Sequence, residues 1–455
     1  MTMDLPKDTG AVPPPWKGGW RTLDRRVYTL SVAAFVRSSG RSASWIFLPL
    51  LLYVGYHLSL IQVGLLVSAL VPLSVLVNLL GGVATDRYGR RWFAMVPPFG
   101  AAMVFFALYR FWDAGLGLMM VLWALNIVLI NIQQPAQNAM LGDVTRPAER
   151  TVAFGVQRVF SNSGFALAPA VGGLLAASYG LPVVFLMSTV TAIGEGIVLL
   201  AFLKESFRGT ASASRTQTPK GDPGSHRWGE GLRYPFRDRF LISFGVLGFA
   251  LTVVTQQFGT PLTLFLGTAQ HLPFAEIGLV YSMNGIVVVA LQIPISWGVQ
   301  HRKLLWMAVG ALLYGTAFLV LDISPGFLID LAAIFVLTLG EDITSPLQNA
   351  VLSGLSGPAR RGSYFGAYNV FTSSAQAFAP ALGTLLLGIS NETLWLPIAA
   401  LTVVVAMGYT LLYRSEAHVP EAPPGGAGPI GTPLFVTPAT GVTGGKHTGY
   451  GHTGP

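Results

Sequence analysis

The sequence predicts an all-α membrane protein with twelve transmembrane helices in two pseudo-symmetric six-helix bundles. Three observations support this fold class: the composition, the number of long apolar segments and an internal repeat. Of the 455 residues, 52% are hydrophobic and 11% are charged, and the mean hydropathy is +0.57. Soluble proteins carry about 25% charged residues. The chain has no cysteine, which excludes disulfides, thiolate metal sites and cysteine nucleophiles.

Twelve apolar segments of about 20 residues, separated by glycine, proline or charge, have the length needed to cross a bilayer as helices. The first of them is too long for a signal peptide and follows Arg21, Arg25 and Arg26, so we expect it to remain as a helix. In chain order the expected helices are 28–54, 60–84, 92–110, 116–142, 151–177, 181–203, 240–266, 275–299, 303–322, 326–353, 363–388 and 393–413.

The fourth and fifth predicted helices recur as the tenth and eleventh. Residues 131–175 align with 342–386 without a gap, at a constant offset of 211 and with 21 identities in 45 positions. A repeat with a period of six helices predicts two halves with the same orientation in the membrane. The expected parts are a cytoplasmic N-terminal segment (1–26), the first bundle (27–203), a polar cytoplasmic linker (204–239), the second bundle (240–414) and a disordered cytoplasmic tail (415–455).

Lysine and arginine gather in alternate loops, which indicates the orientation. The loops after the second, fourth, sixth, eighth and tenth predicted helices carry these cations, whereas the other loops carry almost none. Since cationic loops stay on the cytoplasmic side, we expect a multi-pass protein of the cell membrane with both termini in the cytoplasm. The same bias accounts for nearly all of the net charge of +8, so no nucleic-acid partner is expected.

Residues 82–91, between the second and third predicted helices, read GVATDRYGRR. Gly82 allows a neighbouring helix to approach, and Gly89 permits a turn. Asp86 can face the positive end of a helix, while the arginines can bind carboxylates and lipid phosphates. The pattern G-x-x-x-D-R-x-G-R-R resembles motif A of the major facilitator superfamily, whose fold has the same two six-helix bundles.

This resemblance implies a conformational latch. In that family the loop holds the two halves in the outward-facing state: the residue matching Asp86 meets the start of the eleventh helix, and an arginine meets an acid after the fourth helix, here Asp143. An ordinary cytoplasmic loop explains the arginines, but not the spacing of the glycines and the aspartate. The expected latch residues are Gly82, Asp86, Arg87, Gly89, Arg90, Arg91 and Asp143.

The fifth predicted helix carries a pattern of small residues around a proline. The pattern resembles motif C, the antiporter signature of the same family, and departs from it only at Ala168, where the family has glycine. Small residues permit close helix packing and the proline introduces a kink, and packing alone would also retain much of the pattern. The motif residues are Gly155, Gly164, Ala168, Pro169, Gly172 and Gly173.

Charged residues in the middle of predicted membrane helices are candidates for proton coupling, because charge is costly in a bilayer. Arg37 and Arg41 share one face of the first helix, Glu341 and Asp342 lie in the tenth, and Glu195 lies in the sixth. The resemblance places the first and tenth helices at a central cavity, so the arginines and the Glu341–Asp342 pair are expected to meet there. Either acid could take up a proton, or the charges could form a permanent ion pair. Glu195 is either a second proton site or a locally bonded acid.

Polar and aromatic residues on the helices expected at the cavity are candidates for contacting a substrate. The repeat aligns Asn131 with Asp342, which predicts a cavity that is polar on one side and acidic on the other. Aromatic side chains at such positions also pack against helices or lipid. The cavity candidates are Asn131, Gln134, Gln256, Gln257, Asn284 and Trp45.

No motif of a hydrolase, metalloprotease or nucleotide-binding enzyme occurs, so we expect neither catalysis nor a metal or cofactor. The energy source is then an ion gradient, with protons favoured over sodium, or the substrate gradient itself. The resemblance to drug:proton antiporters predicts a monomeric transporter that exports lipophilic, drug-like compounds in exchange for protons. The alternatives are a symporter or uniporter of a small metabolite or organic anion, which the helix 1 arginines would suit, and a non-transporting membrane receptor.

Overall fold

The computed structural model describes residues 23–88, 90–146, 149–202, 235–299, 301–324, 326–355, 361–390 and 394–416. Long apolar runs form helices here because a helix satisfies its own backbone hydrogen bonds, which a bilayer cannot do. The helices of the first bundle are α1 (Arg25–Leu50, extended by the π-helical turn η2, Leu51–Gly55), α2 (Leu60–Tyr88), α3 (Arg90–Phe111), α4 (Leu116–Asp143), α5 (Arg150–Tyr179) and α6 (Val183–Phe202).

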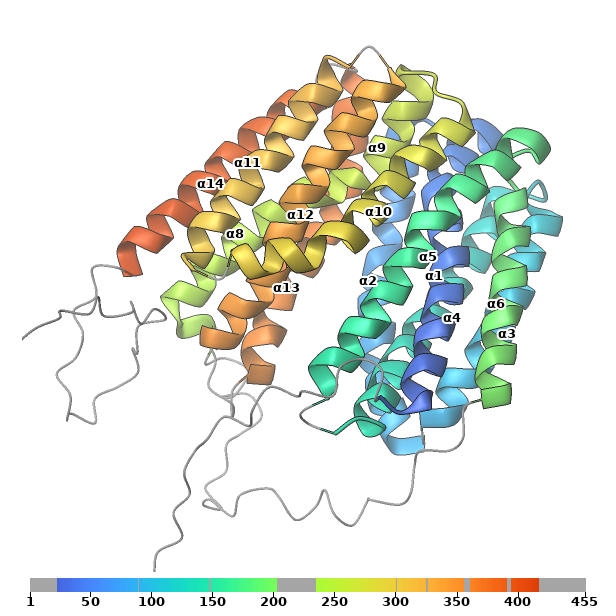
Figure 1. Cartoon of the computed structure of the whole chain (residues 1–455). Coiled ribbons are helices and arrows are strands. Elements are labelled where there is room, and N and C mark those ends of the chain that lie inside the picture. Colours follow the sequence, from blue (N-terminus) through green and yellow to red (C-terminus); the bar gives the residue numbers. More distant parts are fainter. Residues whose placement is uncertain are drawn as a thin grey trace, which may run out of the picture.

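The second bundle repeats this plan with one interrupted helix (Figure 1). Its first span consists of α8 (Arg239–Thr255), η5 (Gln256–Phe258), α9 (Thr260–Leu264) and η6 (Phe265–Ala269), preceded by the short turn η4 (Pro235–Arg237). The remaining spans are α10 (Phe274–Gly298), α11 (Lys303–Asp322), α12 (Phe327–Leu355), α13 (Arg361–Ile389) and α14 (Trp395–Glu416). The described residues thus form twelve helical spans, which confirms the predicted fold class.

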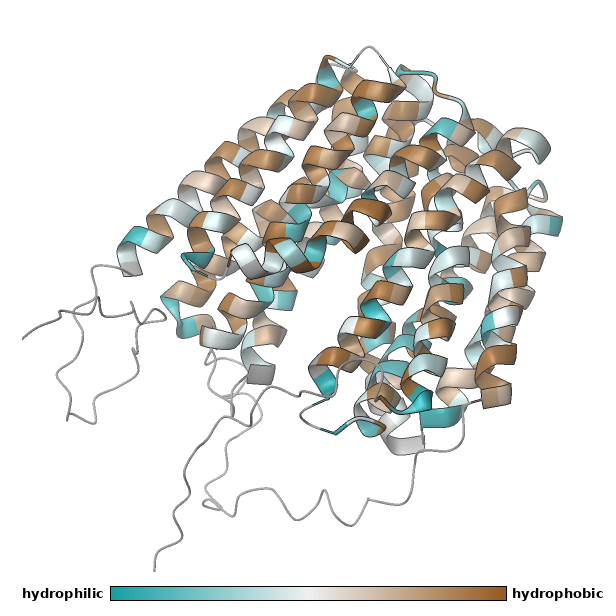
Figure 2. Ribbon diagram, in the orientation of Figure 1, coloured by the Kyte–Doolittle hydropathy of each residue, from teal (hydrophilic) through white to brown (hydrophobic). Residues whose placement is uncertain are grey.

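Ten of these spans are long and apolar enough to cross a membrane by composition alone. The two that fall short are α1 and α12, the helices that carry the arginines and the adjacent acids. The outer faces of the spans are largely apolar (Figure 2), with exposed side chains such as Leu79, Met103 and Leu328. A lipid environment suits such a surface, because it is far larger than the apolar patches of a soluble monomer.

The seventh span is not the single continuous helix that its apolar run predicts. The helix breaks at Gly259, whose φ of −83° and ψ of −122° are not helical. Pro261 follows at the start of α9, where its missing N–H is tolerated. A Cβ on Gly259 would lie 3.1 Å from the ring of Trp45 in α1, so the break is also a close contact between the bundles.

The two bundles meet through two related helix pairs, α5 with α10 and α13 with α2. In each pair a serine hydroxyl accepts a hydrogen bond from the backbone N–H that follows a helix proline: Ala170 donates to Ser282 and Ala381 donates to Ser68, both over 3.0 Å. Ala170 and Ala381 are 211 residues apart, the offset of the sequence repeat. The repeat therefore builds both sides of a pseudo-symmetric interface.

These contacts lie toward the end of the molecule where α5 and α13 finish and where α2 and α10 begin. At the opposite end, where α1 starts, the bundles diverge (Figure 1). The bundles are therefore in contact at one end, termed the closed end, and their helices diverge at the other, termed the open end. Most of the predicted N-terminal segment, linker and tail (1–22, 203–234 and 417–455) lies outside the described residues.

Candidate functional site

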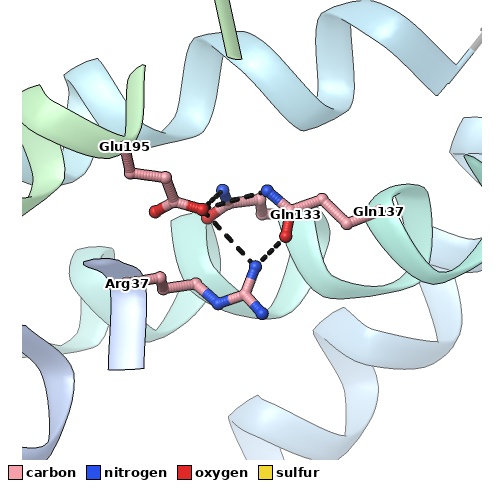
Figure 3. A network of polar contacts seen from close by, with 4 residues as sticks. All are labelled: Arg37, Gln133, Gln137 and Glu195. Carbon is pink, nitrogen blue, oxygen red and sulfur yellow. Dashed lines mark hydrogen bonds and ion pairs between the residues drawn. The ribbon is translucent and has the colours of Figure 1, made fainter. Parts of the chain in front are cut away.

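A buried polar network joins three helices of the first bundle (Figure 3). Glu195 of α6 accepts hydrogen bonds at Oε1 from Gln133 over 2.7 Å and from Gln137 over 3.0 Å, both from α4. Arg37 of α1 lies 3.4 Å from the same oxygen and also donates to the Gln137 side-chain oxygen. The side chains of Arg37 and Glu195 are 15% and 3% exposed, so this ion pair is shielded from solvent.

The expected meeting of the helix 1 arginines with Glu341 and Asp342 is wrong for Arg37, which pairs with Glu195 instead. The reason is helix packing: α6 lies against α1, whereas α12 packs against α10 and α11. The sequence does contain a signal for this network. Gln133 and Gln137 are four residues apart and therefore share one face of α4.

A cavity of about 160 Å³ lies inside the first bundle, one helical turn from this network. Arg41, Trp45 and Asn131, all candidates from the sequence, line it. Both polar atoms of the Asn131 amide are engaged, because its oxygen accepts from Ser74 over 3.0 Å and its nitrogen donates to the Ile127 carbonyl over 2.8 Å. Arg41 makes no ion pair with an acid among the described residues, so the expected contact with the α12 acids is absent for this arginine too.

The two adjacent acids of α12 have different surroundings. Glu341 accepts a hydrogen bond from Asn284 of α10 over 2.9 Å, and Asn284 also donates to Thr338 over 3.0 Å. Asp342 is 1% exposed, and neither of its carboxyl oxygens has a hydrogen-bond partner within the described part of the chain. Arg158 of α5 lies within electrostatic range of both acids. The cation facing these acids therefore comes from α5 rather than from α1.

Glu341 lines a cavity of about 380 Å³ in the second bundle, between α8, α12 and α13. Gln256 lines it as expected, but Gln257 is fully buried and donates to the Val253 carbonyl over 2.8 Å. Gln134 is half-buried on α4. Sequence reasoning missed most of the polar lining, namely Thr252, Thr255, Thr344, Ser345, Gln348, Asn349, Asn369, Thr372 and Gln376.

The missed residues follow a helical period, which is a signal that the sequence does contain. From Glu341, positions 345, 348 and 352 lie on one face of α12, and 365, 369, 372 and 376 lie on one face of α13. A polar stripe inside an apolar helix marks the side that faces a cavity.

The motif A region is partly described. Arg90 forms an ion pair with Asp143 at the end of α4, the contact that the resemblance implies. Arg91 points its Nε toward the Met95 sulfur at 3.3 Å. Gly89 and the side-chain environments of Gly82, Asp86 and Arg87 lie outside the described residues. The role of this region as a latch therefore stays a prediction.

The motif C residues lie in tight helix contacts on two faces of α5. An added Cβ would lie 2.4 Å from the Phe35 carbonyl oxygen at Gly164 and 2.9 Å from the Ala43 Cβ at Gly172, both on α1. At Gly173 it would lie 2.3 Å from the Phe274 carbonyl oxygen, across the interface between bundles. The Pro169 carbonyl approaches Gly278 of α10 in the same way, and Ala168 is fully buried. Gly155 has no neighbour within 4 Å of an added Cβ.

A family model described as Major Facilitator Superfamily matches residues 30–380 and 301–442. The chain belongs to the major facilitator superfamily. Members of this superfamily are membrane transporters and not enzymes, so the prediction of a transporter without catalytic activity is confirmed.

Several relatives within the superfamily are named for resistance or ion exchange. Multidrug resistance protein 2 of Bacillus subtilis (strain 168) is 24% identical over 372 residues, covering 80% of this chain and 88% of the relative. The Na(+), Li(+), K(+)/H(+) antiporter of Planococcus maritimus is 25% identical over 363 residues, covering 74% and 84%. Quinolone resistance protein NorA of Staphylococcus aureus (strain MSSA476) is 20% identical over 363 residues, covering 78% and 88%.

Solved structures of the superfamily share the fold. The crystal structure of peptide transporter POT in complex with sulfate superposes with a TM-score of 0.68 at 18% identity, covering 86% of this chain and 94% of that one. The crystal structure of nucleoside transporter NupG gives 0.68 at 13% identity, covering 85% and 99%. At these identities the comparison establishes the two-bundle architecture alone.

Proposed function

We propose that this superfamily member is a secondary transporter that exports lipophilic, drug-like organic compounds in exchange for protons. The relatives named for multidrug and quinolone resistance and for cation/proton antiport support this function. The transporter works by alternating access, as a monomer in the cell membrane, and uses the proton gradient in place of a cofactor.

The two bundles are in contact at one end of the molecule and diverge at the other, and this difference supports alternating access. With both termini in the cytoplasm, as the arginine distribution indicates, the open end of the molecule faces the cytoplasm. The closed end then faces outward and is held by the α5–α10 and α13–α2 contacts. A substrate would enter this conformation from the cytoplasm, which is the loading step of an exporter.

The observation that carries proton coupling is the Glu341–Asp342 pair in the middle of α12. Glu341 borders the cavity of about 380 Å³, where it can meet both substrate and protons. Asp342, the next residue, is buried, and its carboxyl oxygens have no hydrogen-bond partner in the described residues. An unpaired carboxylate is costly inside a membrane, so a bound proton stabilises this region. A change of access that moves Arg158 relative to the acids would then change how readily they bind a proton.

The test is transport by the purified protein in liposomes that contain a pH-sensitive dye. A lipophilic cation moving one way should drive protons the other way, and Glu341→Gln or Asp342→Asn should abolish the proton signal while the protein still folds. Glu276→Gln in the first turn of α10 is a matched control that removes an acid outside this pair.

An uptake transporter for an organic anion or small metabolite is the second candidate. It is favoured by Arg41, which pairs with no acid among the residues that the structure describes. Movement of protons in the same direction as the substrate would establish it and overturn antiport. Substrate exchange that needs no proton gradient would instead indicate a uniporter. Substrate transport that depends on sodium would identify sodium, rather than the proton, as the coupling ion.

A further inference from the structure

Arg41 is an exposed cation of α1, and no acid pairs with it among the described residues. Arg37, Arg41 and Glu195 together line one small cavity of the first bundle. Glu195 is already engaged by Arg37 and by two glutamine amides. An exposed guanidinium that no acid neutralises can receive an anion or hydrogen-bond acceptors. This part of the bundle therefore has an excess of positive charge.

A second donor without an acceptor borders the same cavity. Asn126 of α4 is 1% exposed, and its side-chain nitrogen has no hydrogen-bond partner among the described residues. Both Asn126 and Arg41 line the cavity of about 160 Å³. An exposed cation and a buried amide donor without an acceptor line the same cavity, which indicates a ligand that brings negative charge and acceptor oxygens.

The remaining walls of this cavity are aromatic and aliphatic. Trp45 and Trp123 contribute ring surfaces, and Val67, Leu70 and Val71 of α2 contribute aliphatic surface. A protein cavity of about 150 Å³ is large enough to hold a benzene ring. The size and lining therefore suit a flat apolar group attached to the anionic group.

The cavity also adjoins the contact between the bundles. The Trp45 ring lies against Gly259, where the seventh span is broken, so a ligand beside Trp45 is one side chain away from the second bundle. Binding at this position can affect both halves, as a transported substrate must.

We propose that this cavity binds the aromatic carboxylate of an organic anion, with Arg41 and Asn126 holding the carboxylate and the two tryptophans holding the ring. The inference rests on the proposed function in that it names a class of exported substrate. It concerns a different site from the Glu341–Asp342 pair, so each can be tested alone.

Equilibrium binding to the purified full-length protein in detergent tests the site without any proton gradient. The probes are 1-naphthoate, the uncharged 1-naphthamide of nearly equal shape, and chloride. Naphthoate should bind at least about tenfold more tightly than naphthamide, because a hydrogen bond to a charged group contributes about a factor of ten or more. Arg41→Gln should remove this preference, while Arg146→Gln, which deletes an exposed surface charge, should keep it.

Asn126→Asp distinguishes loss of the site from loss of the fold. The new carboxylate would repel the carboxylate of the probe in the same cavity, so naphthoate binding should fall at least about tenfold while cooperative thermal unfolding is retained. A misfolded variant would lose both. Equal binding of naphthoate and naphthamide, unchanged binding in Arg41→Gln, or competition by chloride at equal concentration would overturn the proposal.

The outcomes also separate this inference from the proposed function. Naphthoate binding without proton exchange in liposomes would retain the carboxylate site and reject antiport. Proton exchange driven by lipophilic cations, with no naphthoate binding, would retain antiport and reject the carboxylate site.

Discussion

At the residue scale, the role of each charged side chain in the membrane helices depends on what it contacts rather than on its position in the sequence. Arg37 and Arg41 are one helical turn apart, yet Arg37 pairs with Glu195 and Arg41 borders a cavity. Glu341 and Asp342 are neighbours, yet one is hydrogen-bonded to Asn284 and the other is buried without a partner in the described residues. Pairing therefore fixes Arg37 and Glu195 in place, whereas Arg41 and Asp342 can respond to a ligand or a proton.

The Arg37–Glu195 pair leads to a stability prediction. Glu195→Gln should destabilise the first bundle by about 3–5 kcal/mol, because it leaves a buried arginine without its counter-charge. The measurement is thermal unfolding in detergent.

The double variant Arg37→Gln with Glu195→Gln should recover most of the lost stability, because it removes both charges. If the double variant is as unstable as the sum of the two single variants, the ion pair is not what holds these helices together.

At the element scale, the repeated Ala-Pro segments hold the two bundles together at one end. Ala170 and Ala381 donate to serines of the opposite bundle, and Gly173 brings the backbones of α5 and α10 into contact. The pattern that resembles an antiporter signature is thus also the surface that closes one side of the transporter. In the proposed alternating access this surface separates, so its packing should influence the balance between the two conformations.

Gly173→Val should disrupt this closed end and shift the protein away from the observed conformation, because an added Cβ would meet the Phe274 carbonyl at 2.3 Å. The chain has no cysteine, so a pair of introduced cysteines can carry spin labels for distance measurements. The label distance across the closed end should increase.

Gly155→Ala is the matched control for that experiment, since no atom lies within 4 Å of an added Cβ at Gly155. The label distances in this variant should equal those of the unmodified protein. An unchanged distance in Gly173→Val would show that the contact does not set the conformation.

At the scale of the whole molecule, the two bundles share one architecture but carry opposite charge in their interiors. The first bundle has an excess arginine at its cavity, while the second has two acids and a polar cavity. The repeat aligns Ile130 with Glu341 and Asn131 with Asp342, so the acids are present in one half only. If both proposed sites are correct, an anionic substrate and a proton bind in different halves of the same molecule.

The Arg90–Asp143 pair predicts how the balance between conformations responds to mutation. If motif A stabilises the outward-facing state, as the resemblance implies, Asp143→Asn should increase the population of the conformation described above, which the proposed orientation makes inward-open. Spin labels at Val152→Cys and Leu355→Cys, at the diverging ends of α5 and α12, report this opening as a longer mean distance.

Glu149→Gln is the control for the latch experiment, because the ion pair that Glu149 forms in the described part of the chain is with the exposed Arg146, at 3.9 Å. A distance distribution that is the same for Asp143→Asn and Glu149→Gln would contradict the latch.

The sequence by itself determined the twelve spans, to within four residues at each end, together with the two-bundle plan. Both are local or repeated properties, since each helix satisfies its own backbone hydrogen bonds and the repeat copies a packing surface. Only the tertiary structure decided that Glu195 pairs with Arg37, that the seventh span breaks at Gly259 and that Arg41 and Asn126 share a cavity. These features depend on which helices pack together, and a hydropathy pattern gives no information about the partner of a buried side chain.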